Sequence, residues 1–404
     1  MKTITITNWI KISLFSLLVV AFLGVLMRYK IAFELPFLAQ KNIQHAHSHF
    51  AFSGWVTQLL MVLMVHYLQK FIPESKIKKY HLIFLTNIIA SYIMLVSFIV
   101  QGYGLVSIVF SALSIFIFIW FAVYFLTDSK EIPKESLPKK WFLASLFFGV
   151  LSSIGTFSLA YMMATKNVPQ DLYLSSVYFY LHFQYNGWFW FAGLGLFAGL
   201  LEQKLQNIRA NTLIFRLFFW SCLPAYLLSV IWLKLPDWVF VVAIIASIVQ
   251  IFAWFKLVKM SRSFFKVNPT ISQFLKSLLI GIAFCVTVKL LLQFGSVFPA
   301  LSKLAFGFRP IVIAYLHLVL LAITSGFLIF YLFANQLLLS SKKTILFLIV
   351  FVFGVFLNEL VLGLQGVFAI NYVLIPFANE MLFFIALILL SGISGIIYTA
   401  SRKS

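Results

Sequence analysis

The sequence predicts an all-α polytopic membrane protein with twelve transmembrane helices, grouped as three units of four helices. Three observations support this fold class. Of the 404 residues, 63% are hydrophobic and only 10% are charged, whereas a soluble domain carries about 25% charged residues. The apolar residues gather in runs of about 20 or more, the length that crosses a bilayer as a helix. A histidine-containing motif also recurs at intervals of about one third of the chain.

Twelve apolar segments follow one another with short connections, which leave no room for a soluble domain. In order, they are 8–28, 45–70, 80–102, 104–127, 141–165, 174–201, 212–233, 236–257, 274–296, 310–334, 344–365 and 371–399. The first is too long for the apolar region of a signal peptide and lacks a small-residue cleavage site, so we expect it to remain as a helix. All twelve exceed the roughly 10-residue alternating strands of a membrane β-barrel. We therefore expect residues 1–404 to form a single membrane domain.

The distribution of basic residues predicts the orientation. The formal net charge is +20, but in so apolar a chain Lys and Arg mark membrane edges, which favours a lipid bilayer over nucleic acid as the partner. The N-terminus, the C-terminus and the connections after even-numbered segments hold 20 Lys and Arg, and the remaining connections hold 7. The positive-inside rule then places both termini in the cytoplasm, for a multi-pass protein of a bacterial-type inner (cytoplasmic) membrane.

A repeated motif occupies the second, sixth and tenth segments. Residues 49–55 read HFAFSGW, residues 182–188 read HFQYNGW, and residues 317–322 give the weaker HLVLLA. His182 follows His49 by 133 residues, and His317 follows His182 by 135. Self-similarity at a fixed period indicates a repeat architecture. The expected repeat units are approximately 1–135, 136–270 and 271–404, each with a histidine on its second helix.

These histidines are expected at one depth, in the outer part of the membrane, because all three helices run inwards. We expect His49, His182 and His317 to converge there, whereas His66 and His81 lie near the opposite face. Ionisable groups at one membrane level favour a functional site, although hydrogen bonding between helices or a wet vestibule would explain each one singly. Neutral imidazole is a common ligand of metals and haem.

The cluster on the second segment has its own geometry. At 3.6 residues per turn, His45 and His49 share one helix face and His47 points roughly 200° away. One helix could therefore offer ligands to two neighbouring pockets. Cys222 and Cys285 form no CxxC or CxxCH motif, so the sequence predicts neither a thiolate zinc site nor covalently attached haem.

On these motifs the sequence resembles the haem-copper oxidase superfamily, that is, cytochrome c oxidase subunit I and its smaller relatives, including nitric oxide reductases and NnrS haem-copper membrane proteins. The resemblance covers the whole chain in helix number and repeat, and locally it depends on HAHSHFAFSGW, YLHFQYNGWFWFAGLG and RPIVIAYLHLVLLAITSG. It implies a pseudo-threefold arrangement of four-helix units. It also implies histidine-held haem in the outer part of the membrane, an electron donor (cytochrome c or a quinol) and possible accessory subunits.

Carried over residue by residue, the resemblance implies a haem b between His317 and one of His47 or His49. His182 would then ligate a second haem or, with His45, a copper or non-haem iron, which Glu359 could complete. An interhelical hydrogen bond, to neighbours of Asn358 or to Gln101, is the alternative role for Glu359.

The sequence also departs from the family pattern. The seventh segment, 212–233, has no histidine pair, the tenth has only His317, and Asn186 stands where many oxygen reductases have a tyrosine. The usual copper site cannot be assembled from matching residues.

Three functions follow as hypotheses. The first is a haem-dependent membrane oxidoreductase or gas-handling protein for nitric oxide or oxygen. The second is a non-enzymatic haem or metal sensor, carrier or assembly factor on the same scaffold. The third is a secondary transporter whose histidines relay protons, which the threefold period disfavours because transporter repeats are commonly twofold.

Overall fold

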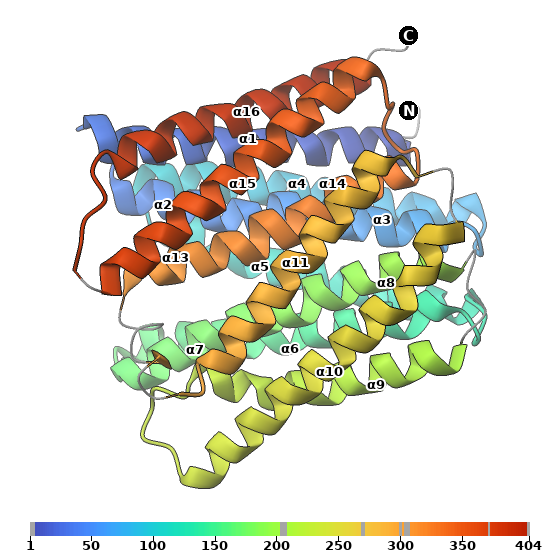
Figure 1. The fold of residues 1–404 in the computed structure, drawn as a ribbon, viewed down its shortest axis with the longest axis horizontal. Helices are drawn as coiled ribbons and strands as arrows, with labels where there is room; N and C mark the ends of the chain where they lie inside the picture. The colour runs from blue at the N-terminus through green and yellow to red at the C-terminus, as the bar shows by residue number, and fades with distance from the viewer. Residues whose placement is uncertain are drawn as a thin grey trace. The chain divides into compact units, whose positions relative to one another are not determined.

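A computed structural model describes residues 5–202, 208–267, 271–298, 301–302, 308–370 and 372–401. Throughout these ranges every regular element is a helix (Figure 1). Each of the twelve expected apolar segments contains a helical run. The last segment was expected from residue 371 but begins as a helix at Ala378. Pro376 explains the delay, because a proline disfavours α conformation in the residue before it.

The chain forms two compact units. Unit 1 comprises Met1–Glu131 and Leu328–Ser404, and unit 2 comprises Ile132–Phe327. The boundary after Glu131 lies close to the end of the first expected repeat at residue 135. The boundary after Phe327 falls inside the third expected repeat, 271–404.

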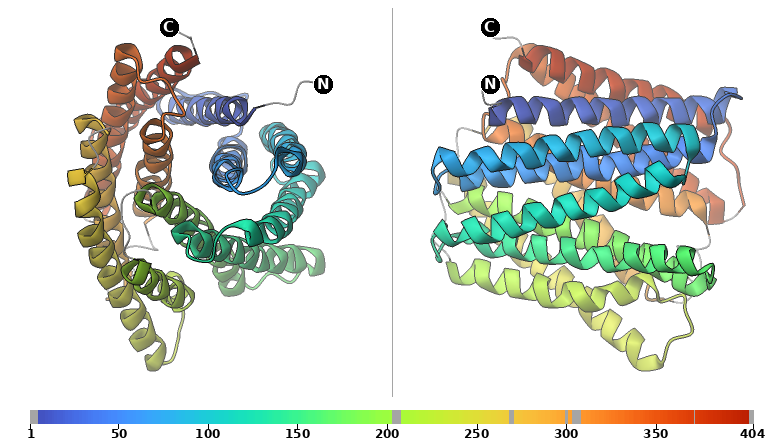
Figure 2. Two further views of the ribbon diagram at one scale, coloured as in Figure 1. Left: turned by 90° about the vertical axis from the view of Figure 1, so that its right-hand side faces the viewer. Right: turned by 180° about the vertical axis from the view of Figure 1, so that it is seen from behind.

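Unit 1 is built around α1, which packs against the second helical run and against α16. Its elements are α1 (Ile6–Phe33), α2 (Gln40–Phe50), η1 (Ala51–Thr57), α3 (Gln58–Leu68), α4 (Glu74–Gln101), α5 (Leu105–Asp128), η2 (Ser129–Glu131), α15 (Lys342–Ile370) and α16 (Ala378–Ser401). The helix α14 (Gly326–Ala334) crosses the boundary between the units. The start of α1 and the end of α16 lie at the same end of unit 1 (Figures 1 and 2).

Unit 2 begins with α6, which packs along the next helical run. Its elements are α6 (Leu137–Thr165), α7 (Gln170–His182), η3 (Phe183–Phe189), α8 (Trp190–Glu202), α9 (Ile208–Ala225), η4 (Tyr226–Ser229), α10 (Asp237–Val267), α11 (Gln273–Gly295), α13 (Arg309–His317) and η5 (Leu318–Ser325). Gly155 lets α6 approach α7 closely, because a Cβ there would lie 2.5 Å from the Ser176 carbonyl oxygen. Small residues serve this purpose at helix contacts in membranes.

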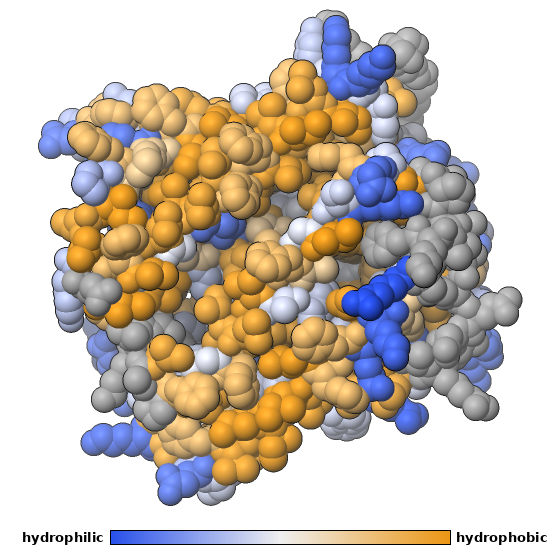
Figure 3. All heavy atoms as spheres, viewed as in Figure 1, coloured by the Kyte–Doolittle hydropathy of each residue, from blue (hydrophilic) through white to orange (hydrophobic). Residues whose placement is uncertain are grey.

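Eleven helical runs among the described residues are long and apolar enough to cross a membrane. Large apolar side chains stay exposed along them, such as Phe255 on α10, Phe284 on α11 and Phe356 on α15, which are 55%, 68% and 60% exposed. Hydrophobic side chains cover most of the visible faces of these helices (Figure 3). Such faces require lipid, and the protein is therefore an all-α, multi-pass membrane protein.

The helical run Gln170–Glu202 is not among the eleven. It has the length of a spanning helix, 33 residues from α7 to the end of α8, but polar side chains at its centre lower its hydropathy. These are His182, Gln184 and Asn186. The polar centre of this run is also the part that the repeated motif singles out.

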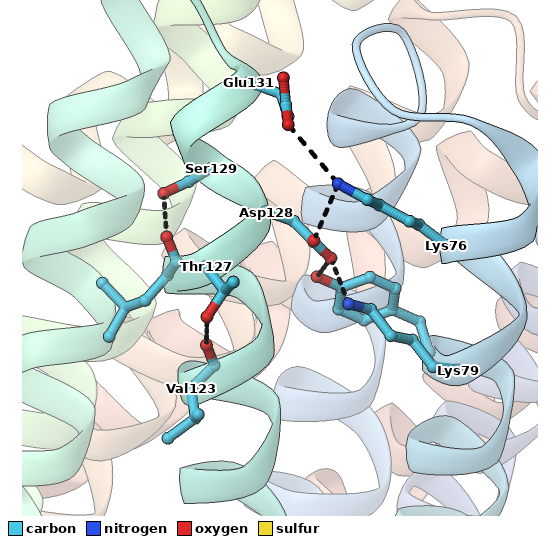
Figure 4. A network of polar contacts seen from close by, with 9 residues as sticks. Lys76, Lys79, Val123, Thr127, Asp128, Ser129 and Glu131 are labelled. Carbon is cyan, nitrogen blue, oxygen red and sulfur yellow. Dashed lines mark hydrogen bonds and ion pairs between the residues drawn. The ribbon is translucent and has the colours of Figure 1, made fainter.

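A network of charges joins α4 to the end of α5 (Figure 4). The carboxylate of Asp128 is buried and lies 2.8 Å from the Lys79 ammonium and 3.9 Å from that of Lys76. The Tyr80 hydroxyl donates a 2.7 Å hydrogen bond to the same carboxylate, and Lys76 also pairs with Glu131. Two lysines of the basic connection 71–79 therefore also hold two helices together.

Candidate functional site

Three π-helical segments mark the helices that carry the repeated motif. They are η1, η3 and η5, which begin two residues after His49, one after His182 and one after His317. A π-helical turn holds one more residue than an α-helical turn, and such turns occur frequently at functional sites. This irregularity, within one residue of the same register in all three helices, was not expected from the sequence, because hydropathy does not distinguish π from α turns.

The glycine of the motif has a packing role. A Cβ on Gly54 would lie 2.6 Å from Cε2 of Phe50, and a Cβ on Gly187 would lie 2.5 Å from Cβ of Phe148. Both glycines stand five residues after their histidine, where the third copy has Ala322. The glycine therefore allows an aromatic ring to lie against the π turn in the first two copies.

The histidines of α2 face two directions, as their spacing predicts. The ring centroids of His45 and His49 are 6.4 Å apart. His49 stacks on Phe98 of α4 at 4.5 Å, and its Nε2 lies 3.0 Å from the Tyr103 hydroxyl. His47 instead faces α1, where its Cε1 would lie 3.7 Å from a Cβ built on Gly24.

His182 is completely buried in unit 2, and both of its ring nitrogens have protein partners. Nε2 lies 2.9 Å from the Cys222 carbonyl oxygen, and Nδ1 lies 3.2 Å from the Asn186 side-chain nitrogen. A carbonyl can only accept, so Nε2 carries the proton and Nδ1 accepts from the amide. In this arrangement neither nitrogen offers a lone pair to a metal.

His317 has a different pattern. Its Nδ1 lies 2.9 Å from the carbonyl oxygen of Ile313, one turn earlier on α13. The carbonyl fixes the tautomer in which Nδ1 carries the proton and Nε2 the lone pair. This is the orientation that a backbone carbonyl gives to metal-ligating histidines. The partner of Nδ1 is thus a backbone carbonyl of the same helix.

The sixth and tenth helical runs meet inside unit 2. The segment η3 packs against η5, and the rings of Tyr185 and Tyr315 lie 6.2 Å apart with their hydroxyls hydrogen-bonded. The two motif copies of this unit are therefore neighbours. His45, His47 and His49 belong to unit 1, so their expected convergence with His182 and His317 stays a prediction.

Glu359 accepts a 3.1 Å hydrogen bond from the adjacent Asn358 side chain on α15. This bond lies within one helix and differs from the interhelical bond considered for it. Within the described parts of the chain, no group of three or more His, Cys, Asp or Glu side chains is placed to hold a metal ion. The set His45, His182 and Glu359 does not fit a copper or non-haem iron, because both nitrogens of His182 are engaged. We derive no second metal centre from it.

The sequence motifs did not identify a small polar cavity in unit 2. It is lined by Asn186, Trp190, Phe191, Phe218, Cys222, Gln250, Lys289 and Leu290 and has room for about one water molecule. Lys289 is 4% exposed, and its ammonium lies 5.3 Å from the centre of the Trp190 ring. The Asn186 side-chain oxygen is buried and has no hydrogen-bond partner among the described residues. In the sequence, the sign of a polar site here is the position of Lys289 inside the apolar segment 274–296.

No family model matches the chain, and no curated protein is similar to it in sequence.

Proposed function

We propose that the chain is an integral membrane haem protein of the haem-copper oxidase type, which binds or reduces a diatomic gas, nitric oxide or oxygen. The observation that carries this proposal is the pairing of the repeated histidine with a π-helical turn in three helical runs at nearly equal spacing. Chance repetition of a sequence pattern gives no reason for the same backbone irregularity in each copy. The proposal includes twelve spanning helices in a pseudo-threefold arrangement.

His317 and one histidine of α2 are the proposed axial ligands of a haem b. His317 fits this role because the Ile313 carbonyl leaves the lone pair on Nε2. His47 is the better candidate on α2, because His49 already has its Nε2 beside the Tyr103 hydroxyl. Bound haem would supply the redox-active iron, and the protein would supply the imidazoles, their orientation and an apolar surrounding.

The test of this proposal is a pyridine haemochrome spectrum of the purified protein, produced with an ample supply of haem. We expect a b-type spectrum, because the chain has no CxxCH motif for covalent attachment. A wild-type protein that is folded but contains no haem would refute the proposal. A haem-loaded protein without gas reduction in the presence of an electron donor would favour a sensor or carrier.

The orientation has an independent test. With both termini in the cytoplasm, a phosphatase that is active only in the periplasm should be inactive when fused after Ser404. The same phosphatase fused in the connection after α1, between Glu34 and Leu38, should be active. The expected contrast follows from the 20-to-7 distribution of Lys and Arg. Strong activity of the C-terminal fusion would contradict the orientation.

A secondary transporter is the second candidate, and Lys289 is the observation that favours it. Ionisable side chains buried within spanning helices commonly belong to ion or substrate pathways. Lys289 lines the same cavity as the polar side chains of Asn186 on η3 and Gln250 on α10. A haem-free protein that accumulates substrate in proteoliposomes would establish this alternative.

A further inference from the structure

The histidine pair on one face of α2 forms a cluster with a tyrosine that was not identified from the sequence. His45 and His49 are one turn apart, and Tyr103, in the connection between α4 and α5, lies over both of them. Its ring centre is 4.6 Å from that of His45, and its hydroxyl is 3.0 Å from Nε2 of His49. All three residues belong to unit 1.

The turn after α4 brings Tyr103 to this place. Gly102 has φ +62°, in the left-handed region that favours glycine, and a Cβ there would lie 2.6 Å from the Asn42 side-chain oxygen. The Asn42 amide donates a hydrogen bond of 3.3 Å to the Ile99 carbonyl, which ties α2 to the end of α4. The position of the tyrosine relative to the histidines is therefore built into the backbone.

One nitrogen of this cluster lacks a partner. Nε2 of His45 is buried and has no hydrogen bond among the described residues. Leaving a buried polar atom unsatisfied costs about 1–3 kcal/mol. The ring of His49 is fixed by Phe98, because it stacks on that buried ring with an angle of 21° between the planes. The unsatisfied nitrogen of His45 lies beside the fixed imidazole of His49 and the phenol of Tyr103, and a bound ion would satisfy it.

The donor set and spacing suit a metal ion. Two histidines one turn apart on a helix can bind the same ion, as in metalloprotease helices. With metal–nitrogen distances of 2.0–2.1 Å, two imidazoles bound to one ion at a tetrahedral angle have ring centres about 5 Å apart. The observed separation is 6.4 Å, so the two rings must approach each other by about 1 Å when the ion binds. Imidazole ligands suit zinc, copper, iron and nickel, and among divalent ions of this series Cu²⁺ binds most tightly.

We propose that Nε2 of His45, Nε2 of His49 and the phenolate oxygen of Tyr103 form a binding site for a divalent first-row transition metal, with Cu²⁺ bound most tightly. When the ion binds, the Tyr103 hydroxyl releases its proton to solvent and its hydrogen bond with His49 is replaced by two metal–ligand bonds. Tyr103 is 54% exposed, which gives the ion a path from outside the bundle. His47 faces α1 and takes no part in the site. With His47 as the haem ligand of α2, the metal site uses different histidines from the proposed haem site and does not depend on it.

The experiment is a Cu²⁺ titration of the full-length protein in detergent, after removal of any affinity tag and treatment with a chelator. Binding is followed by calorimetry and by electron paramagnetic resonance. We expect one tightly bound Cu²⁺ with hyperfine coupling to two nitrogens. His45→Ala and His49→Ala should each weaken binding by about 100-fold or more and remove one nitrogen coupling, since loss of even an outer-shell partner costs 10–100-fold.

Three further variants make the result specific. His47→Ala should bind Cu²⁺ like the wild type, which excludes chelation by neighbouring pairs that include His47. His66→Ala is the control for a histidine outside the site and should also bind Cu²⁺ like the wild type. In the wild type, Nδ1 of His66 pairs with the Gln69 side chain. Tyr103→Phe should weaken binding by about 10-fold and remove the phenolate-to-copper absorption band. Far-ultraviolet circular dichroism checks that each variant is folded.

The proposal is overturned if the folded double variant His45→Ala/His49→Ala binds Cu²⁺ as tightly as the wild type, or if His47→Ala abolishes binding. Binding that shows nitrogen coupling but is unchanged in Tyr103→Phe would overturn the assignment of the oxygen ligand. Wild type and variants are all produced and compared in the haem-free form, because His47→Ala removes a proposed haem ligand; the copper result is then independent of haem binding.

Discussion

With His317 as a ligand of the proposed haem, we expect its replacement by glycine to abolish the low-spin haem spectrum and to leave the helices inserted in the membrane. The imidazole of His317 is held by the Ile313 carbonyl, so that Nε2 is the nitrogen that would bind the iron. Without this imidazole the proposed haem would have one protein ligand fewer, and its spectrum would change or the haem would be lost. The measurement is the absorption spectrum of the oxidised and reduced protein, together with its haem content.

Addition of free imidazole provides a sharp control. In the His317→Gly variant, imidazole can enter the space left by the side chain and should restore part of the low-spin spectrum. His66→Ala, at the other end of the same unit-1 run as His49, should keep the wild-type spectrum, because that side chain pairs with Gln69. An unchanged low-spin spectrum in His317→Gly would remove this residue from the proposed ligands.

The helices could be predicted from the sequence because lipid imposes a simple rule. Every spanning segment must satisfy its backbone internally and present apolar side chains, so hydropathy alone located runs such as Ile6–Phe33 and Lys342–Ile370 to within a few residues. The last helix was misplaced at its start, where Pro376 acts locally. The face shared by His45 and His49 also followed from helical periodicity.

The chemistry of each histidine could not be predicted in this way. Whether an imidazole offers a lone pair depends on its hydrogen-bond partners, and hydropathy does not identify them. His182 was expected to bind a cofactor like His317, but its nitrogens meet the Cys222 carbonyl on α9 and the Asn186 amide. The Nδ1 of His317 instead meets a carbonyl of its own helix. Similar positions in the repeated motif therefore have different capacities.

For Lys289 the sequence shows the position of the residue but not whether its side chain is buried. Its position within an apolar segment was visible in the sequence, but a single lysine there can snorkel to the membrane surface. The structure places it 4% exposed beside a polar cavity and the Trp190 ring. No carboxylate forms an ion pair with it in the described ranges, where the ion pairs all involve Lys76 or Lys79.

Replacing Lys289 by methionine will therefore raise the stability of the folded protein. Burial of an ion costs several kcal/mol, and replacing buried charges by apolar residues of similar volume is often stabilising by about 1–4 kcal/mol. The ammonium gains about 2 kcal/mol from a desolvated contact with an aromatic ring, and the methionine variant would lose this contribution. The burial cost is the larger quantity, so the net change favours the variant.

The measurement is denaturant unfolding in detergent, followed by circular dichroism, on wild type and variants with equal haem content. Lys276→Met is the matched control on α11, because Lys276 is only half-buried near the start of that helix and surface substitutions usually change stability by less than about 0.5 kcal/mol. A Lys289→Met protein that is more stable but inactive would show that the buried amine is kept for function at a cost in stability. A less stable variant would mean that the amine is paired with an anion in the cavity, and the account of Lys289 as an uncompensated charge would be wrong.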